Sequence, residues 1–453
     1  MEHQGWLSVI PTLAVLLIAL KTRKTFEALL GGSLIGFMLV SGLGFFNDFT
    51  NSLLGVMKDP TIGWVILVCG LFGALIQLLI KTGGASAFAD YMLRYVKHRK
   101  SALLVTWLLG LLIFIDDYLN ALTVGNTMKR VTDKFKVPRE MLAYIVDSTA
   151  APICVLIPLS TWAIYIASLL ETTGVMPTGE GLAGYLKTIP YIAYGWVAAL
   201  IVPLVAMNWI PALGAMKKAE QRVEAGGTLA PAKSDTMAIE IDVQQGAQPK
   251  LADFALPIIV LIGATIAFEI DALKGILTSL GFVLVYQVLV RKQLSFAQAF
   301  EESFLGFKSM IYALAIIIMS FVLKDVNDQL GLTQFVIEGI TPIMNKNWLP
   351  AVAFATLSLV TFATGSFWGV YAITLPIVIP MANTMGVDPW LAIGSVISAG
   401  AFGSHACFYG DATVLSASAT GCNNMSHALT QLPYALLAGG LSFVIFILLG
   451  HLV

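Results

Sequence analysis

The feature that most constrains this chain is a series of apolar stretches, each about as long as a lipid bilayer is thick. A helix needs roughly 20 mainly apolar residues to cross the hydrocarbon core, and stretches near that length recur from Gly5–Leu20 to Leu432–Leu449. Charged residues make up only 12% of the 453 positions, whereas soluble domains carry about 25%. The sequence therefore predicts an all-α polytopic membrane protein.

Composition and motifs also exclude several classes of function. The formal net charge of −1 does not supply the concentrated basic face that nucleic acid requires. The sequence has no phosphate-binding loop, no zinc-ligand spacing among its histidines and single cysteines, and no nucleophile–base pairing. We therefore expect no cofactor and no enzymatic activity, and a membrane-embedded enzyme or assembly scaffold is the least favoured hypothesis.

The stretch Phe114–Trp162 concentrates polar residues in apolar surroundings. It contains Asp116, Asp117, Asn120 and Asp147. A charged side chain at mid-bilayer depth costs at least about 2.5–3.5 kcal/mol, so it normally marks a functional site. Two alternatives stay open. Either Asp116 or Asp117 caps a helix by accepting hydrogen bonds from its backbone N–H groups, and Asp147 caps a helix in the same way at a second break.

The basic residues indicate how this stretch crosses the membrane. Clusters at Lys21–Lys24 and Arg94–Lys100 are expected in the cytoplasm, which places the N-terminus outside the plasma membrane of a prokaryote. A single span over 101–128 would then deliver the basic loop 129–139 to the outside. A re-entrant hairpin near 101–128 removes the conflict, and the alternative is that the charge bias fails here. Irregular backbone at membrane depth must be buried or line a wet cavity.

The second half resembles the first. A polar cytoplasmic linker, 215–250, separates membrane halves at 1–214 and 251–453, and a shift of 250 positions pairs several residues, among them Ser148 with Ser398. We expect a second hairpin near 349–380 and a helix over Leu391–Ser418 broken at Gly400–His405. The glycines at that break usually serve close helix packing. The pattern predicts an inverted repeat, as in many secondary transporters.

These polar residues suit cation transport. Asp, Asn, Ser and Thr supply hard oxygen ligands, and broken helices near the midplane are where secondary transporters bind ions and substrates. A carboxylate that holds either a proton or a cation, in competition, is sufficient for exchange. The sequence does not show whether an organic solute is carried as well.

The motifs at 114–125 (FIDDYLNALTVG) and 147–152 (DSTAAP) resemble the NhaC-type sodium/proton antiporter family of the ion-transporter superfamily. The run at 410–416 (GDATVLS) is similar to that family's second-half motif. The resemblance implies an inverted-repeat fold with a scaffold and a transport domain, often dimeric, that moves sodium ions and protons. The run at 403–409 departs from the family pattern, and family members also carry amino acids and organic acids.

We therefore predict a sodium/proton-coupled exchanger, or alternatively a sodium- or proton-coupled carrier of a small amino acid or organic acid. The predicted cation- and proton-binding residues are Asp116, Asp117, Asn120, Thr123, Asp147, Ser148, Thr149, Asp411 and Thr413, with Asp117, Asn120, Asp147 and Ser148 as sodium ligands. The predicted substrate-binding residues are Gly365, Ser366, Trp368, Ser404, His405 and Tyr409. Alternatively, His405 is a hydrogen-bonded interior residue, and the aromatic side chains, including Trp162, belong to the core or the membrane interface.

Overall fold

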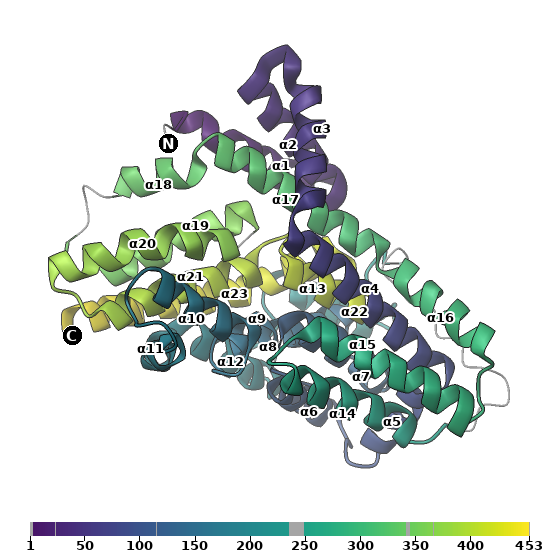
Figure 1. Cartoon of the computed structure of the whole chain (residues 1–453). Helices are drawn as coiled ribbons and strands as arrows, with labels where there is room; N and C mark the ends of the chain where they lie inside the picture. Colours follow the sequence, from purple (N-terminus) through teal and green to yellow (C-terminus); the bar gives the residue numbers. More distant parts are fainter. Residues whose placement is uncertain are drawn as a thin grey trace.

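The computed structural model of the chain describes residues 3–22, 24–114, 116–234, 249–340, 345–365 and 367–452, and across them it is helical, without a strand. Six of its helices are long and apolar enough to cross a membrane, or up to eight if each of two bent pairs is one span. The prediction of an all-α membrane protein is confirmed. Figure 1 shows the helices packed into one elongated bundle, with α14, α15, α16 and α5 toward one end and α19, α20 and α21 toward the other.

The helices of the first half are η1 (Gly5–Val9), α1 (Ile10–Thr22), α2 (Thr25–Ser41), η2 (Gly42–Gly44), α3 (Phe45–Lys58), α4 (Pro60–Lys81), α5 (Gly84–Met92), α6 (Arg99–Leu112), α7 (Asp117–Lys134), α8 (Arg139–Thr149), α9 (Ala151–Cys154), α10 (Thr161–Thr172), α11 (Gly181–Thr188), η3 (Ile189–Tyr191), α12 (Ala193–Ala206) and α13 (Gly214–Glu224). Those of the second half are α14 (Ala252–Ala267), α15 (Ala272–Val285), η5 (Tyr286–Val290), α16 (Phe296–Ser309), α17 (Ile311–Gln329), α18 (Leu332–Ile340), α19 (Leu349–Thr364), α20 (Phe367–Met385), α21 (Pro389–Ala406), α22 (Asp411–Thr420) and α23 (Asn424–Leu452).

Helix boundaries repeat along the chain at the spacing that the sequence suggested. Helices α6, α7, α8 and α10 begin at residues 99, 117, 139 and 161, and α19, α20, α21 and α22 begin 250 residues later, at 349, 367, 389 and 411. These four helices therefore follow one another at the same spacing in both sets, although the first set also contains the short helix α9 between α8 and α10. That the two sets have opposite orientation in the membrane stays a prediction, as does a division into scaffold and transport domains.

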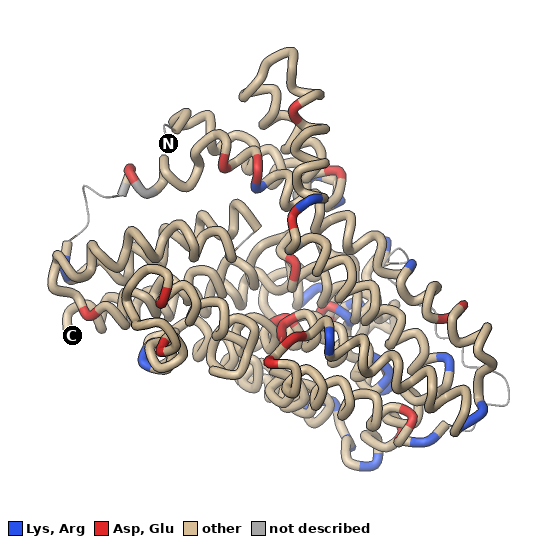
Figure 2. The backbone as a smooth tube through the Cα atoms, viewed as in Figure 1, with Lys and Arg blue, Asp and Glu red and all other residues tan. Residues whose placement is uncertain are grey.

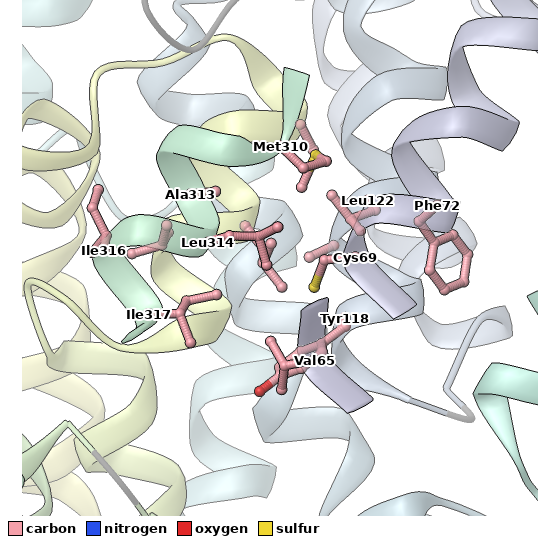
Figure 3. Close-up of a cluster of buried hydrophobic side chains, with 14 of the residues drawn as sticks. Val65, Cys69, Phe72, Tyr118, Leu122, Met310, Ala313, Leu314, Ile316 and Ile317 are labelled. Carbon is pink, nitrogen blue, oxygen red and sulfur yellow. The ribbon is translucent and has the colours of Figure 1, made fainter. Parts of the chain in front are cut away.

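Two apolar cores hold the bundle together. The first is built mostly from α1–α7 with α14–α17, and the second mostly from α8–α13 with α19–α21 and α23. Figure 3 shows part of the first core, where Cys69 and Phe72 of α4 meet Leu122 of α7 and Leu314 of α17. Helices in a bilayer associate through van der Waals packing. The site lies where α7, α8, α22 and α23 pack together.

Small residues let some of these helices touch backbone to backbone. A Cβ atom on Gly73 of α4 would lie 2.4 Å from the carbonyl oxygen of Gly306 in α16. A Cβ on Gly400 would lie 2.1 Å from the hydroxyl of Tyr371, and one on Gly403 would lie 2.2 Å from Cβ of Thr361. Gly73 thus packs α4 against α16, and Gly400 and Gly403 pack α21 against α20 and α19.

The predicted break at Gly400–His405 is wrong, because α21 continues through these residues to Ala406. The helix ends in extended backbone at Cys407, with φ −67° and ψ 139°, and α22 begins at Asp411. Gly400 and Gly403 allow close packing against Tyr371 and Thr361 and do not bend the helix. In the first half the break falls at Ala150, two residues before Pro152, and proline disfavours a continuous helix at such a place.

The segment predicted as a polar linker begins with a packed helix. Met216, Ala219 and Val223 of α13 are buried, and Arg222 donates two hydrogen bonds of 2.8 Å to the buried carboxylate of Glu140 in α8. This hydrogen bonding raises the pKa of Arg222. Helix α13 therefore holds the start of α8, and Asp147 lies in the last turn of that helix. Residues 235–248 lie outside the described residues.

Candidate functional site

The start of α7 is capped by Asp116, so the capping alternative holds for this residue. One carboxylate oxygen accepts hydrogen bonds of 3.0 Å from the backbone N–H groups of Tyr118 and Leu119. The other accepts a 3.0 Å bond from the hydroxyl of Thr161, at the start of α10. A carboxylate at this position satisfies free N–H groups and complements the helix dipole. Both oxygens of Asp116 are thus engaged within the protein.

Asp117 is placed differently, in the first turn of α7. Its side chain is only 1% exposed, and its Oδ2 atom has no hydrogen-bond partner among the described residues. The indole N–H of Trp162 acts on this carboxylate as a donor, but not at the distance and angle of a hydrogen bond, so both atoms lack a hydrogen-bond partner among the described residues. The indole ring stacks on Phe367 at 3.7 Å between centroids. A buried carboxylate oxygen without a donor is costly unless a ligand or a proton meets it.

Asn120 ties together the ends of two helices. Its amide nitrogen donates to the carbonyl oxygens of Gly110 at 2.7 Å, Ile113 at 2.8 Å and Thr149 at 2.8 Å. The first two belong to the end of α6 and the third to the end of α8. In a continuous helix, ten residues would separate Gly110 from Asn120 by about 15 Å. The contact therefore shows that the chain turns back between α6 and α7, as a hairpin requires.

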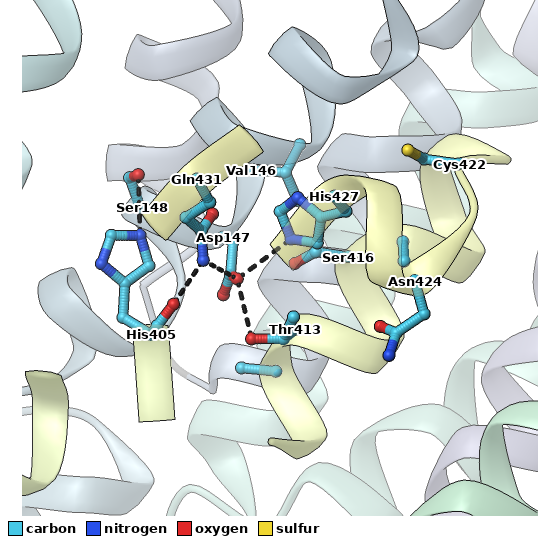
Figure 4. A network of polar contacts seen from close by, with 12 residues as sticks. Val146, Asp147, Ser148, His405, Thr413, Ser416, Cys422, Asn424, His427 and Gln431 are labelled. Carbon is cyan, nitrogen blue, oxygen red and sulfur yellow. Dashed lines mark hydrogen bonds and ion pairs between the residues drawn. The ribbon is translucent and has the colours of Figure 1, made fainter. Parts of the chain in front are cut away.

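Asp147 sits at the centre of a buried polar network (Figure 4). Its Oδ2 atom accepts hydrogen bonds from the hydroxyl of Thr413 at 3.1 Å and the amide of Gln431 at 2.6 Å, and it lies 3.1 Å from Nε2 of His427. Its Oδ1 atom has no partner among the described residues. One oxygen is thus held by two helices, α22 and α23, and the other is left for a proton or a cation.

The neighbouring Ser148 points away from this carboxylate. Its hydroxyl lies 2.9 Å from Nε2 of His405, and the hydroxyl of Tyr194 lies 2.6 Å from the other ring nitrogen. The backbone carbonyl of His405 also accepts a hydrogen bond from Gln431. Both ring nitrogens of His405 are engaged within the protein, which is the interior hydrogen-bonded arrangement named as its alternative.

The first turn of α22 connects the two aspartate groups. Asp411 accepts a hydrogen bond from the phenol of Tyr118, next to Asp117. Two residues later, Thr413 donates to Asp147 and lies 3.3 Å from the carbonyl oxygen of Ser404. Thr413 of this short helix thus meets two other predicted residues, Asp147 and Ser404. No local sequence pattern could predict that α22 lies between the two aspartate groups of the first half.

A cavity of about 690 Å³ borders the start of α7; we call it the outer cavity. Carboxylates, aromatic rings and one lysine line it, together with apolar side chains. The lining residues that matter below are Asp59, Trp64, Asp116, Asp117, Tyr118, Tyr165, Glu269, Asp271, Lys324 and Trp368. A second cavity of about 540 Å³ shares Asp59 and Lys324 with it. Of the predicted substrate-binding residues, Trp368 lines the outer cavity.

Other predicted residues have their own surroundings. Thr123 borders a small apolar space beside Phe72 and Phe254. The hydroxyl of Thr149 bonds back to its own helix, at Ile145 and Val146. Gly365 ends α19 in the left-handed region, and a Cβ there would lie 2.9 Å from the ring of Tyr409. Tyr409 is buried and donates to the carbonyl oxygen of Ala363, Ser404 is buried without a side-chain partner among the described residues, and Ser366 lies outside them.

Sequence reasoning missed His427 and Gln431, both of which contact Asp147. They lie four residues apart in α23, near the start of a long apolar helix, and both are buried. Polar residues on one face of such a helix signal a buried site, so the spacing was available in the sequence. Tyr194 carried no comparable signal, because an aromatic residue in an apolar span usually belongs to the core.

The proposed sodium ligands form two groups rather than one. Asp117 borders the outer cavity, whereas Asp147 belongs to the inner network and Ser148 turns to His405. Among the described residues, no group of three or more His, Cys, Asp and Glu side chains is arranged to hold a metal ion. Near Asp117, Oδ1 of Asn120 is also buried and unpartnered among these residues.

Comparison with known proteins followed from this geometry. A family model described as the Na+/H+ antiporter family matches residues 178–451. An uncharacterized protein of Haemophilus influenzae is 28% identical over an alignment that covers 98% of this chain and 90% of that protein. The crystal structure of the Alcanivorax borkumensis YdaH transporter aligns with 97% of this chain and 98% of its own, at 14% identity and a TM-score of 0.43.

Proposed function

This chain belongs to the Na+/H+ antiporter family, and from that premise we propose that it exchanges sodium ions for protons across the membrane, with Asp117 and Asp147 binding the two ions in competition. Membership makes it an integral membrane transporter, in agreement with its apolar helices. The assignment of the two aspartates and of the exchange itself is our proposal.

The observation that carries this proposal is the unpartnered oxygen of Asp117. The carboxylate is buried, borders a cavity and receives no hydrogen bond at Oδ2 from the described residues. A proton or a sodium ion would each relieve the cost of burying it. Because one carboxylate oxygen cannot bind both ions at once, binding of either releases the other, and alternating access on the two sides then gives exchange.

The inner aspartate supports the same chemistry. Asp147 also keeps one oxygen without a partner among the described residues, while its other oxygen is fixed by Thr413 and Gln431. Thr413 and Gln431 are neutral donors, so they hold the side chain in one orientation without neutralising its charge. A cation that leaves the outer cavity would meet this second carboxylate on its way inward.

The distribution of charge supports an orientation in which the outer cavity faces outside. Its rim includes Asp59, before α4, and Glu269–Ala272, between α14 and α15. Both segments lie at the ends of helices whose opposite ends carry basic residues, Lys81 in one half and Arg291 in the other. Figure 2 shows Lys and Arg gathered mainly toward the lower right of the molecule. The bias of basic residues toward the cytoplasm places that end inside.

Proteoliposomes with a trapped pH dye test the proposal. An external sodium pulse should raise the internal pH of vesicles that contain the wild-type protein, and potassium should do so less. Asp117→Asn should reduce the signal to that of empty vesicles while the variant still elutes as a folded protein. Asp90→Asn, an exposed aspartate of α5, is the matched control and should retain exchange. Normal exchange by Asp117→Asn would remove this residue from the site.

A second candidate function is a sodium- or proton-coupled carrier of a small organic solute. The volume of the outer cavity favours it, because about 690 Å³ falls in the range of roughly 300–1,000 Å³ typical of small-molecule sites. A sodium ion alone needs far less space. Coupled uptake of a labelled solute that depends on a sodium or proton gradient would establish this function.

A further inference from the structure

We propose that the outer cavity binds an organic ammonium ion with an aromatic or otherwise apolar body, as a substrate or as a competitor of sodium. The inference rests on the proposed function, since it takes Asp117 as the cation-binding group. It goes further by naming the chemical class of a larger ligand. Three features carry it: the charge of the lining, the aromatic walls and the state of the single lysine.

The lining is strongly acidic. Five carboxylates border the cavity, at Asp59, Asp116, Asp117, Glu269 and Asp271, against one ammonium group, that of Lys324, among the described lining residues. Asp271 is paired at 3.1 Å with Lys274, which is not among the lining residues, and both oxygens of Asp116 accept hydrogen bonds. A cleft lined by one sign of charge concentrates ligands of the opposite sign. The buried Oδ2 atom of Asp117, unpartnered among the described residues, is the end of the cavity at which a positive group would be held.

The walls are aromatic on two sides. Trp64 and Tyr118 lie with 6.0 Å between ring centroids and their rings tilted by 43°, and Tyr165 meets Trp368 edge to face at 4.6 Å. The hydroxyl of Tyr165 donates to the backbone carbonyl of Trp368 at 2.9 Å, which fixes the second pair. Aromatic faces attract cations and bury apolar groups. A small inorganic ion needs no such walls, whereas an amine with an apolar body fits both parts of the cavity.

The groups that would favour an anion are largely engaged. The ammonium group of Lys324 lies 2.8 Å from Asp328, one turn along α17. The free N–H groups at the start of α7 are already capped by Asp116. The start of α20, next to Trp368 and Gly369, is the feature that would attract a carboxylate. Probes of similar size that share a phenyl ring and differ in charge therefore decide between a cation and its alternatives.

The experiment measures binding to the purified full-length protein by calorimetry. Four probes of similar size are compared: 2-phenylethylamine, 2-phenylethanol, 3-phenylpropionate and phenylalanine. We expect the amine to bind at least tenfold more tightly than the other three, and sodium to weaken its binding because both occupy Asp117. Tighter binding of the carboxylate, the alcohol or the amino acid, or no binding by any probe, would overturn the inference.

Variants locate the site. Trp368→Ala should weaken amine binding at least fivefold, whereas Trp209→Ala, an exposed tryptophan that does not line the cavity, should leave amine binding unchanged. Trp368→Phe keeps an aromatic face and should retain most of the affinity, which guards against a folding defect in the alanine variant. Unchanged amine affinity in Trp368→Ala would place the amine elsewhere and refute the proposal.

Failure of this inference and failure of the proposed function are distinguishable. Sodium/proton exchange without amine binding would remove the ammonium site and leave exchange standing. Amine binding that depends on Trp368, in a protein without sodium-driven pH changes, would remove exchange and leave the ammonium site standing.

Discussion

Asn120 offers the sharpest test of how the site is held together, because two roles predict opposite results for one substitution. As an amide, its nitrogen donates to three backbone carbonyls at the ends of α6 and α8. The orientation of the amide is fixed, since each of the three neighbours is an acceptor and only the nitrogen can donate. The side chain is fully buried. We expect its main role to be bracing the hairpin rather than binding the ion.

The magnitude follows from the number of donors lost. Asn120→Ala removes two N–H groups, and interhelical hydrogen bonds in membrane proteins are worth about 0.6 kcal/mol on average and up to about 1.7. The loss should therefore be roughly 1–3 kcal/mol. Asn120→Asp also removes both donors and in addition places an acceptor against three carbonyl oxygens, which costs several kcal/mol more unless a proton bridges them. The aspartate variant should be the less stable of the two.

The assay is the loss of folded, monodisperse protein on heating in detergent, with sodium present and absent. The matched control is Asn126→Ala in the same helix, because Asn126 donates one bond of 2.9 Å to the carbonyl oxygen of Leu122 in its own helix. That variant should change stability by less than about 0.5 kcal/mol, as for a local bond. If Asn120→Asp proves at least as stable as wild type and binds sodium more tightly, Asn120 is an ion ligand and the bracing role is refuted.

Two further predictions concern the packing around the site. Gly403→Ala would place a Cβ only 2.2 Å from Cβ of Thr361, whereas a Cβ on Gly440 meets nothing within 4 Å. In the same heating assay, Gly403→Ala should lose about 1–3 kcal/mol of stability from overpacking, and Gly440→Ala should be near neutral. Equal stability of the two variants would contradict the close packing. Arg222→Met leaves the buried carboxylate of Glu140 without its two charged hydrogen bonds and should lower stability by about 3 kcal/mol. Adding Glu140→Gln removes the unpaired charge and should recover part of that stability. No loss in the single variant would show that α13 does not hold α8.

Much of the architecture was available in the sequence, because each inference rested on a local physical cost. Apolar stretches of bilayer length indicated a membrane protein. The shift of 250 residues matched helix boundaries in four pairs of helices. The break in the second broken helix was misplaced, since Gly400 and Gly403 can serve a bend or a close contact, and their neighbours Tyr371 and Thr361 come from other helices.

The site was only partly predictable for a related reason. The cost of burying a charge identified Asp117 and Asp147 without any knowledge of the fold. The roles of Asp116 and Asn120 depend on which atoms end up opposite them, and those atoms come from α6, α8 and α10. His427 and Gln431 had a usable signal in their four-residue spacing within an apolar helix, but their partner Asp147 lies some 280 positions earlier.

The arrangement of α22 bears on how two ions could influence each other. Its first turn contacts Tyr118 through Asp411, beside the outer cavity, and contacts Asp147 through Thr413, in the inner network. A short helix moves as a unit, because its own hydrogen bonds fix these two residues relative to each other. A cation that draws Asp411 or Tyr118 toward Asp117 would therefore shift the donor that Thr413 gives to Asp147. In the proposed exchange, either ion displaces the other at one carboxylate, and this link would in addition let sodium at Asp117 weaken the hold on a proton at Asp147.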